Sequence, residues 1–333
     1  MAKQLKIGIL GMGHLGRIHA KCLQLLPDQY DLVGFYDPDA AQAEKRSQEF
    51  GIPSFASEEK LIDAVEVVDI VAPTSAHFSL AKKAMLAKKH IFIEKPLTHS
   101  LSEAQELIDI SEQQKVKVQV GHVERFNPAL LALDGQLLQP MFVEGHRLAS
   151  FNPRGTDVSV VLDLMIHDLD ILLHLVKAKV ESVSASGVAV VSDNIDIANA
   201  RIEFENGCVA NLTASRISIK QMRKMRLFQQ DAYVSLDFLE KKAQIIRLED
   251  EKNTETAFSI PTKQGERWMT MKQPDIEPVN AIKMELSTFA TSILTNTLPK
   301  VSIKDGYKAL HLAHQILEDI QVHREKALDY FTA

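Results

Sequence analysis

Short apolar segments alternate with longer segments of helical periodicity through the first 121 residues. A brief apolar run predicts a buried strand, and apolar positions three or four residues apart predict a helix. The predicted strands are 5–10, 31–37, 65–72, 90–97 and 116–122, and the predicted helices are 17–27, 40–51, 76–89 and 100–114. This alternation predicts a parallel, doubly wound sheet with helices on both faces.

The pattern changes after residue 121, where segments that alternate in polarity follow one another. They lie at 140–150, 180–191, 196–216 and 223–248, and Asn206-Gly207 within them is a strong hairpin signal. We expect a largely antiparallel open sheet here, closed by helices at 277–294 and 302–328. The polar segment 251–275 is expected to be a loop over the site or an exchanged arm.

The chain is therefore expected to be an α/β protein of two domains. A Rossmann domain with a parallel doubly wound sheet is predicted at 1–121. An α+β domain with a largely antiparallel open sheet is predicted at 122–333, and it is expected to bind substrate and to form oligomers. A length of 333 residues suits two domains.

One predicted helix of the second domain, 161–176, carries charges within an apolar run. Asp163 and His167 are four residues apart, so they share one face of a helix. An imidazole titrates near neutrality, which suits removal of a proton from an alcohol. A structural histidine and a helix-start carboxylate are the alternatives for this pair.

Two further carboxylates follow in the same helix. Asp168 points away from Asp163 on a helical wheel, so we expect it to pair with another polar group, such as Arg125 or a backbone amide. Asp170 either supports His167 from behind or is a surface carboxylate. Adjacent helical positions diverge by about 100°, so His167 and Asp168 are poorly placed to chelate one ion, and we expect no metal.

Composition narrows the class of partner. A net charge of −6 argues against a general nucleic-acid surface, which is normally basic. The two cysteines, Cys22 and Cys208, give neither a disulfide framework nor zinc-ligand spacing and favour a cytoplasmic protein. No apolar run reaches the length of a membrane span. We therefore expect a small-molecule ligand, with no nucleic acid and no membrane.

A glycine motif after the first strand indicates the cofactor. Gly11, Gly13 and Gly16 fit G-x-G-x-x-G between a strand and a helix, and Asp37 follows the second strand 21 residues past Gly16. The glycines allow a tight turn, close approach of a pyrophosphate and close helix packing. Asp37 would bind ribose hydroxyls and repel a 2′-phosphate, which favours NAD over NADP. The same turn contributes Met12, His14 and Leu15. A glycine turn without a ligand is the alternative.

Five segments of the chain resemble the Gfo/Idh/MocA oxidoreductase family. They are GMGHLG (11–16), APTSAH (72–77), EKPL (94–97), QVGHVERFNP (119–128) and the helix 161–176, and they occur in the family's order. Two departures stand out. Thr74-Ser75 stands where an asparagine often follows, and the family's glycines before D-x-x-x-H are absent.

The resemblance implies roles for individual residues. Lys95 would lie near the nicotinamide and the reacting carbinol. Asp163 and His167 would contact the substrate, with His167 as general acid/base. The cofactor side would also include Pro73, Thr74, His77 and Glu94. The resemblance further implies a homodimer or homotetramer formed through the C-terminal sheet.

Within the family, segment 153–170 is similar to enzymes that oxidise the 3-hydroxyl of UDP-N-acetylglucosamine. Substrate-binding candidates are His122, Arg125, Arg147 and Arg154, because arginine suits phosphate recognition; exposed charges and structural salt bridges are the alternatives. The predicted function is NAD-dependent oxidation of a secondary hydroxyl of a sugar or nucleotide sugar. The alternatives are a non-catalytic NAD-binding regulator of the same fold and a reductase of a ketone, imine or biliverdin-like substrate.

Overall fold

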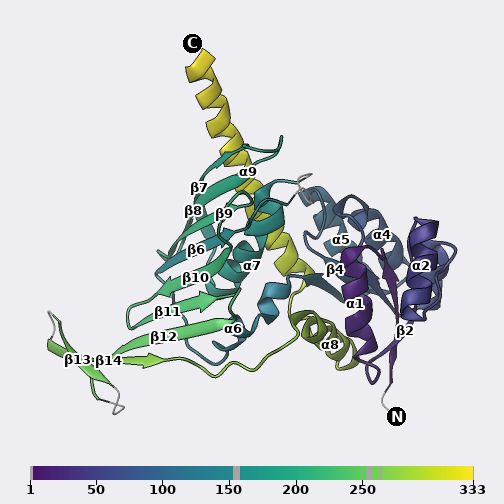
Figure 1. Ribbon diagram of the computed structural model, residues 1–333, viewed down its shortest axis with the longest axis horizontal. Coiled ribbons are helices and arrows are strands. Elements are labelled where there is room, and N and C mark those ends of the chain that lie inside the picture. The colour runs from purple at the N-terminus through teal and green to yellow at the C-terminus, as the bar shows by residue number, and fades with distance from the viewer. Residues whose placement is uncertain (1–2, 153–157, 253–256, 263–264, 333) are drawn as a thin grey trace. The chain divides into compact units, whose positions relative to one another are not determined.

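The structure, a computed structural model, describes residues 3–152, 158–252, 257–262 and 265–332. It divides the chain into two compact units (Figure 1). Unit 1 comprises residues 1–126 and 280–310, and unit 2 comprises residues 127–279 and 311–333. Among the described helices, none is both long enough and apolar enough to cross a bilayer.

Unit 1 contains a parallel sheet with its helices, as the sequence predicts. Its elements to residue 126 are β1 (Leu5–Leu10), α1 (His14–Gln24), β2 (Tyr30–Tyr36), α2 (Ala40–Phe50), α3 (Glu58–Ala64), β3 (Val67–Ile70), α4 (Thr74–Leu86), β4 (His90–Glu94), α5 (Leu101–Gln114), β5 (Val118–Gly121) and the 3₁₀ helix η1 (Val123–Phe126). The strand order is β2-β1-β3-β4-β5, and the described pairs are all parallel. The order places β1 and β3 at the centre, as in a doubly wound fold.

Local sequence signals fix the helix ends in unit 1. Ser100 caps α5 and forms a reciprocal capping box with Glu103, which satisfies backbone groups that the helix leaves unpaired. Gly51 ends α2 in a left-handed conformation with φ +66°, which glycine adopts without steric cost. Strands β3 and β5 are buried along their whole length, which explains their continuous apolar runs.

A late segment of the chain completes unit 1. Helix α8 (Ala281–Leu294) was predicted to close the second domain, but residues 280–310 belong to the compact unit of the first. The ring of Phe289 packs edge-on to Phe92 of β4 at 6.1 Å. The Tyr30 hydroxyl donates to the Leu286 carbonyl at 2.9 Å. The apolar face of α8 therefore fills the core of unit 1, a pairing that the local pattern does not encode.

Unit 2 is built on a large mixed sheet. Its elements are α6 (Pro128–Leu131), β6 (Phe142–Leu148), the π-helical turn η2 (Val161–Met165), α7 (Ile166–Leu175), β7 (Val180–Val188), β8 (Ile197–Phe204), β9 (Val209–Ser215), β10 (Met222–Phe228), β11 (Ala232–Asp237), β12 (Lys242–Glu249), β13 (Phe258–Thr262), β14 (Gly265–Lys272) and most of α9 (Ile303–Thr332). The order is β13-β14-β12-β11-β10-β6-β9-β8-β7. Among the described pairs only β6 and β9 run parallel, so the sheet is largely antiparallel, as predicted.

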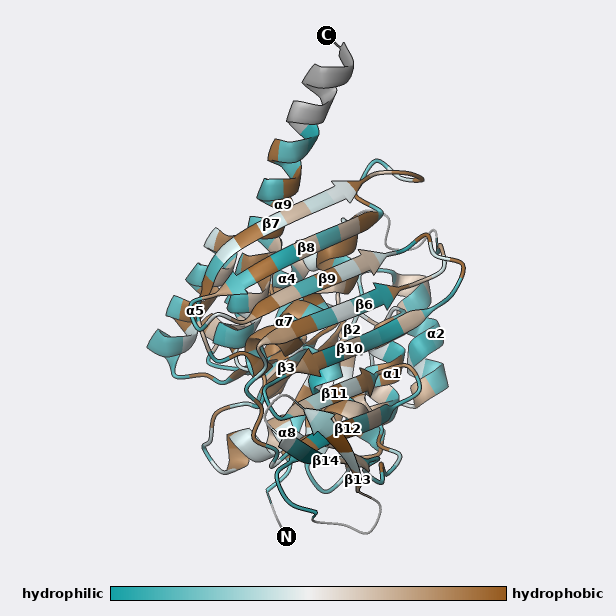
Figure 2. Ribbon diagram, turned by 90° about the vertical axis from the view of Figure 1, so that its left-hand side faces the viewer, coloured by the Kyte–Doolittle hydropathy of each residue, from teal (hydrophilic) through white to brown (hydrophobic). Residues whose placement is uncertain are grey.

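Polarity alternates along the strands of this sheet, as Figure 2 shows in bands of teal and brown. In β8 the buried positions are Ala198, Ala200, Ile202 and Phe204, and the residues between them are half-buried or exposed. One face therefore contributes to a core and the other is largely polar. The segment predicted as a loop or an exchanged arm is not a loop, because it contains β13 and β14, which extend the sheet beyond β12; exchange between subunits stays a prediction.

Candidate active site

The glycine turn after β1 has the geometry that a dinucleotide needs. Gly11 has φ +98°, and a Cβ there would lie 2.9 Å from the Ala72 backbone nitrogen. A Cβ on Gly16 would lie 2.1 Å from the Gly11 carbonyl oxygen, so only glycine lets α1 start this close to the strand. A Cβ on Gly13 would meet nothing within 4 Å, so this residue faces open space. The three predicted glycine roles fit the structure.

A cavity of about 660 Å³ opens beside this turn. Helix α1 begins there with Gly13 at its N-cap, and among the described residues no capping side chain occupies its first amides, so these amides and the helix dipole can hold phosphates. The described lining residues are Leu10, Gly11, Gly13, His14, Leu15, Tyr36, Asp37, Pro38, Gln42, Glu58, Val71, Ala72, Pro73, Ala76, Ser79 and Leu80. The predicted Met12 is fully buried behind the turn, and Thr74 is half-buried at the start of α4.

Asp37 is held in place at the end of β2. One carboxylate oxygen accepts from the Met12 amide at 2.7 Å and from Gln42 Nε2 at 2.9 Å. The other oxygen accepts from the Asp39 amide at 3.0 Å. The described lining residues include no lysine or arginine but include Glu58, so the cavity offers a 2′-phosphate no countercharge. The fit is to NAD. Gln42 and Glu58 were not predicted, because neither belongs to the glycine motif.

The loops after β3 and β4 are tied together by His77. Its ring is buried, with Nδ1 2.9 Å from the Pro96 carbonyl oxygen and Nε2 3.0 Å from the Ala72 carbonyl oxygen. Burial lowers the pKa of His77, although the two carbonyls oppose the shift. The structure thus gives His77 a bracing contact on each ring nitrogen, while Pro73 lines the cavity itself.

Lys95 follows directly at the end of β4. Its side chain is half-buried, and its backbone N–H lies 3.2 Å from Oε2 of the Glu94 carboxylate, which accepts it. His122 and Arg125 follow the next strand, β5, and both are buried in unit 1. The sequence therefore correctly places these residues after the carboxyl ends of neighbouring parallel strands, where ligands bind in such sheets.

Asp163 and His167 lie on unit 2, at the junction of two helical forms. The expected helix begins as the π turn η2 with Asp163 and continues as the α-helix α7 with His167. Both side chains are half-buried, whereas their neighbours Leu162, Met165 and Ile166 are buried. Single π turns recur at functional sites, because they change the direction in which side chains project. The sequence predicted an unbroken α-helix here.

One of the remaining charges of this helix, Asp168, is explained by a buried ion pair. Arg147 of β6 donates from Nε and Nη2 to the two oxygens of Asp168, at 2.9 and 2.7 Å. The partner of Asp168 is thus Arg147 rather than Arg125. Because this guanidinium is buried and engaged by a carboxylate, Arg147 is poorly suited to bind a substrate phosphate. Asp170 is also buried, which excludes the surface alternative. Arg154 lies outside the described residues.

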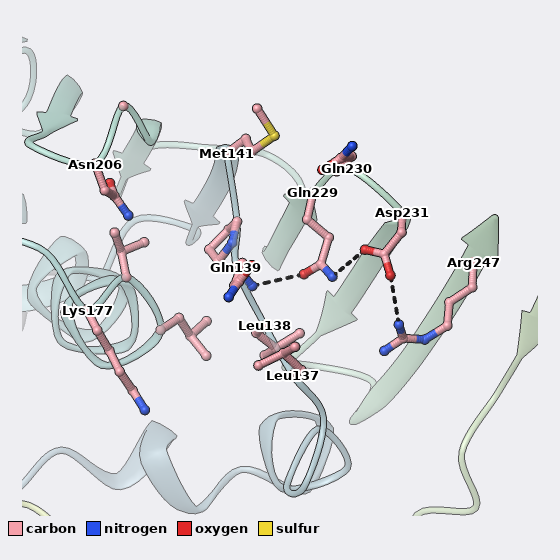
Figure 3. Close-up of a pocket in the computed structure, with 14 residues that line it drawn as sticks. Leu137, Leu138, Gln139, Met141, Lys177, Asn206, Gln229, Gln230, Asp231 and Arg247 are labelled. Carbon is pink, nitrogen blue, oxygen red and sulfur yellow. Dashed lines mark hydrogen bonds and ion pairs between the residues drawn. The ribbon is translucent and has the colours of Figure 1, made fainter. Parts of the chain in front are cut away.

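A second cavity, of about 800 Å³, lies in unit 2 at the turn-bearing ends of the strands (Figure 3). A polar chain crosses it from the Gln139 amide to Gln229, from Gln229 to Asp231, and from Asp231 to Arg247. Of the predicted site residues that the structure describes, none lines this cavity. Its size therefore does not identify it with the predicted chemistry.

Comparison with known proteins gives a consistent assignment. The family described as "Oxidoreductase family, NAD-binding Rossmann fold" matches residues 5–122, and the "GFO/IDH/MocA C-terminal domain" matches residues 131–233. UDP-N-acetylglucosamine 3-dehydrogenase of Acidithiobacillus ferrooxidans is 42% identical over 71% of this chain and 74% of its own length. The NAD(+)-dependent scyllo-inositol 2-dehydrogenase of Bacillus subtilis is 33% identical over 66% of this chain and 69% of its own.

Solved structures agree with this assignment. A structure of the Acidithiobacillus ferrooxidans enzyme superposes with a TM-score of 0.87 at 34% identity and covers 96% of this chain and 99% of that one. Scyllo-inositol dehydrogenase from Lactobacillus casei, solved with NAD(H) and scyllo-inositol, shares the fold with a TM-score of 0.76 at 19% identity. It covers 96% of this chain and 98% of that one. The chain belongs to the Gfo/Idh/MocA family of NAD-binding oxidoreductases.

Proposed function

We propose that this protein is an NAD-dependent dehydrogenase that oxidises a secondary hydroxyl of a nucleotide sugar, the 3-hydroxyl of UDP-N-acetylglucosamine. The proposed substrate rests on the 42% identity to an enzyme named for this reaction. The cofactor rests on the glycine turn and on Asp37, whose cavity offers no countercharge to a 2′-phosphate.

The proposed reaction assigns one task to each of three side chains. The nicotinamide of a bound NAD would supply the hydride acceptor. His167 takes the proton of the substrate hydroxyl, since an imidazole titrates in the range where this transfer is useful. Lys95 stabilises the developing alkoxide by its positive charge, and Asp163 orients the sugar by accepting from its hydroxyls. Of the phosphate candidates, His122, Arg125 and Arg154 remain and Arg147 is withdrawn.

Turnover with a panel of sugars tests this proposal. We expect NADH to form from NAD and UDP-N-acetylglucosamine faster than from free N-acetylglucosamine or inositols. His167→Ala should lower kcat by about 10²–10⁴-fold and leave the Kd for NAD unchanged, because the glycine turn and Asp37 belong to unit 1. His174→Ala, an exposed position on the same helix, is the matched control. Absence of NADH with every substrate would contradict the proposal.

We also propose that the protein is a cytoplasmic homo-oligomer joined through the open face of the unit 2 sheet. The half-buried rings of Phe142, Phe228 and Tyr233 support this, because they form a row of tilted ring contacts across three strands, with centroids 5.9 and 5.0 Å apart. Aromatic side chains are enriched where protein surfaces associate. Light scattering should give two or four times the chain mass of 37.2 kDa, and Phe228→Glu should lower it. A monomeric wild-type protein would contradict this assembly.

A further inference from the structure

Three charged side chains lie buried together in unit 1 and have no task in the proposed reaction. His19 of α1 is fully buried, and its Nδ1 lies 2.9 Å from Oδ2 of Asp69 in β3. Its Nε2 lies 3.2 Å from Oε1 of Glu94 at the end of β4, within ion-pair distance but outside hydrogen-bond geometry. The ring of Phe92 packs edge-on against the imidazole at 5.5 Å. One histidine thus bridges two neighbouring strands of the parallel sheet.

The geometry favours an imidazole that carries both protons, because each ring nitrogen faces a carboxylate oxygen. Burial alone lowers the pKa of His19, but the charges of Asp69 and Glu94 and the hydrogen bond with Asp69 outweigh it and hold this pKa well above 6.5. Burial raises the pKa of Cys22 and that of Tyr30, so these nearby groups stay uncharged near neutrality. His19 is therefore the cation of the cluster.

The carboxylate of Glu94 is held from three directions. One oxygen pairs with His19, and the other accepts the Lys95 backbone N–H at 3.2 Å. Beneath it lies Gly121 of β5, where a Cβ would stand 2.8 Å from the carboxyl carbon of Glu94. Any side chain at Gly121 would push this carboxylate away. Through Glu94, the cluster thus contacts the backbone of Lys95, whose side chain is proposed to stabilise the alkoxide.

We propose that His19 is a positioning residue of the dehydrogenase: its cation locks the Glu94 carboxylate, and that carboxylate fixes the backbone of Lys95. This inference rests on the proposed function, in which Lys95 stabilises the alkoxide. Gly121 contributes to the same arrangement, because its lack of a side chain leaves the space in which the Glu94 carboxylate lies. Reactions of this kind are sensitive to small displacements of a reacting group.

Kinetics of three variants test the coupling. Glu94→Gln removes the negative charge of the Glu94 carboxylate with almost no change in the shape of the side chain. The double variant His19→Gln, Asp69→Asn removes the cation without leaving Asp69 as a buried, uncompensated anion. Both should lower kcat by about ten- to a hundred-fold, with a much smaller change in the Kd for NAD. His90→Gln, at the other end of β4, is the control and should keep wild-type kcat.

A second measurement does not need turnover. In protein with ¹⁵N-labelled histidine, NMR should show both ring nitrogens of His19 protonated at pH 7, above the ordinary histidine pKa of 6.5. In protein with ¹³C-methylated lysines, the Lys95 signal, assigned with Lys95→Arg, should shift in Glu94→Gln but not in His90→Gln. A neutral His19 overturns the inference, and so does a Lys95 signal that does not shift in Glu94→Gln. Wild-type kcat in both variants would also overturn it. So would a loss of kcat accompanied by an equal loss of affinity for NAD. If no sugar yields NADH, the proposed function fails, and the NMR results alone decide the inference.

Discussion

The two units bury charge in different ways. In unit 2 the guanidinium of Arg147 meets one carboxylate, Asp168, with two hydrogen bonds. In unit 1 the imidazole of His19 lies between two carboxylates, Asp69 and Glu94. Arginine keeps its charge at every pH that a protein tolerates, whereas an imidazole can lose its proton. The Arg147–Asp168 pair of unit 2 is therefore a permanent pair. The His19 cluster of unit 1 is a conditional cluster, because it contains a cation only while His19 is protonated.

The ion pair of unit 2 and the cluster of unit 1 stabilise different kinds of structure. The Arg147–Asp168 pair joins β6 to α7 next to His167, so it fixes a helix as a whole. The cluster around His19 orients a single backbone turn at Lys95 through one carboxylate. A matched bidentate pair suits the first task, and a three-part cluster of one imidazole and two carboxyl groups suits the second.

Breaking the permanent pair should have the largest effect on stability. Arg147→Met leaves Asp168 buried and uncompensated, so we expect the free energy of unfolding to fall by about 3–5 kcal/mol in urea titrations. The double variant Arg147→Met, Asp168→Leu should recover most of this loss. Arg226→Met, which breaks the more exposed pair with Glu144 on the same sheet, should cost less than about 1 kcal/mol. Equal losses in both single variants would remove the distinction between the two pairs.

A further buried carboxylate, Asp196, is predicted to have an intermediate effect. One of its oxygens accepts the backbone N–H groups of Val190, Val191 and Ser192, which shapes the connection from β7 to β8. Asp196→Asn should lower the free energy of unfolding by about 2 kcal/mol, and the exposed Asp193→Asn should not.

The same carboxylate makes a prediction about acid. Burial opposes ionisation of Asp196, but the amide donors outweigh it and lower its pKa to about 2. Because the folded-state pKa is below the ordinary value of 3.8, its contribution is complete above pH 3.8 and is lost as pH falls through about 2. Acid titration should show this loss in wild-type protein but not in Asp196→Asn; identical acid profiles would contradict it.

The conditional cluster predicts the smallest effect, on the alkaline side. The folded-state pKa of His19 is raised above 6.5, so its contribution is complete below pH 6.5 and is lost as pH rises through the folded-state pKa. Within that window the loss is about 1.4 kcal/mol per pH unit. Melting temperatures from pH 6.5 to 9 should fall more steeply in wild-type protein than in His19→Gln, Asp69→Asn. Parallel slopes would show that His19 is neutral when folded.

The cofactor site was predictable because its determinants are local. The turn needs glycine at positions set by chain geometry, and Asp37 follows from the length of one strand–helix–strand unit. The cavity brings Gly11, Gly13, His14, Leu15, Asp37 and Pro73 together as predicted. Whether Lys95, Asp163 and His167 act as proposed stays a prediction.

The partners of the buried charges were not predictable, because they are distant in sequence. A helical wheel led to the expectation of a polar partner for Asp168, but it holds no information about Arg147, which lies 21 residues earlier. The π turn at Asp163 escapes notice because its composition suits an α-helix equally well. Gly121 is the overlooked signal for Glu94: a glycine that ends a buried strand indicates that another group approaches closely.

The discontinuity of unit 1 has a consequence for synthesis on the ribosome. Strands β1 to β5 are complete by Gly121, but the helix that packs on Phe92 begins at Ala281. The intervening residues take roughly 8 to 30 s to translate at about 5–20 residues per second. For that time the nascent Rossmann sheet has an unfilled apolar face, including the side of Phe92 that Phe289 later covers. We expect chaperones to bind ribosome-held chains that end before α8 and to release those that extend past it.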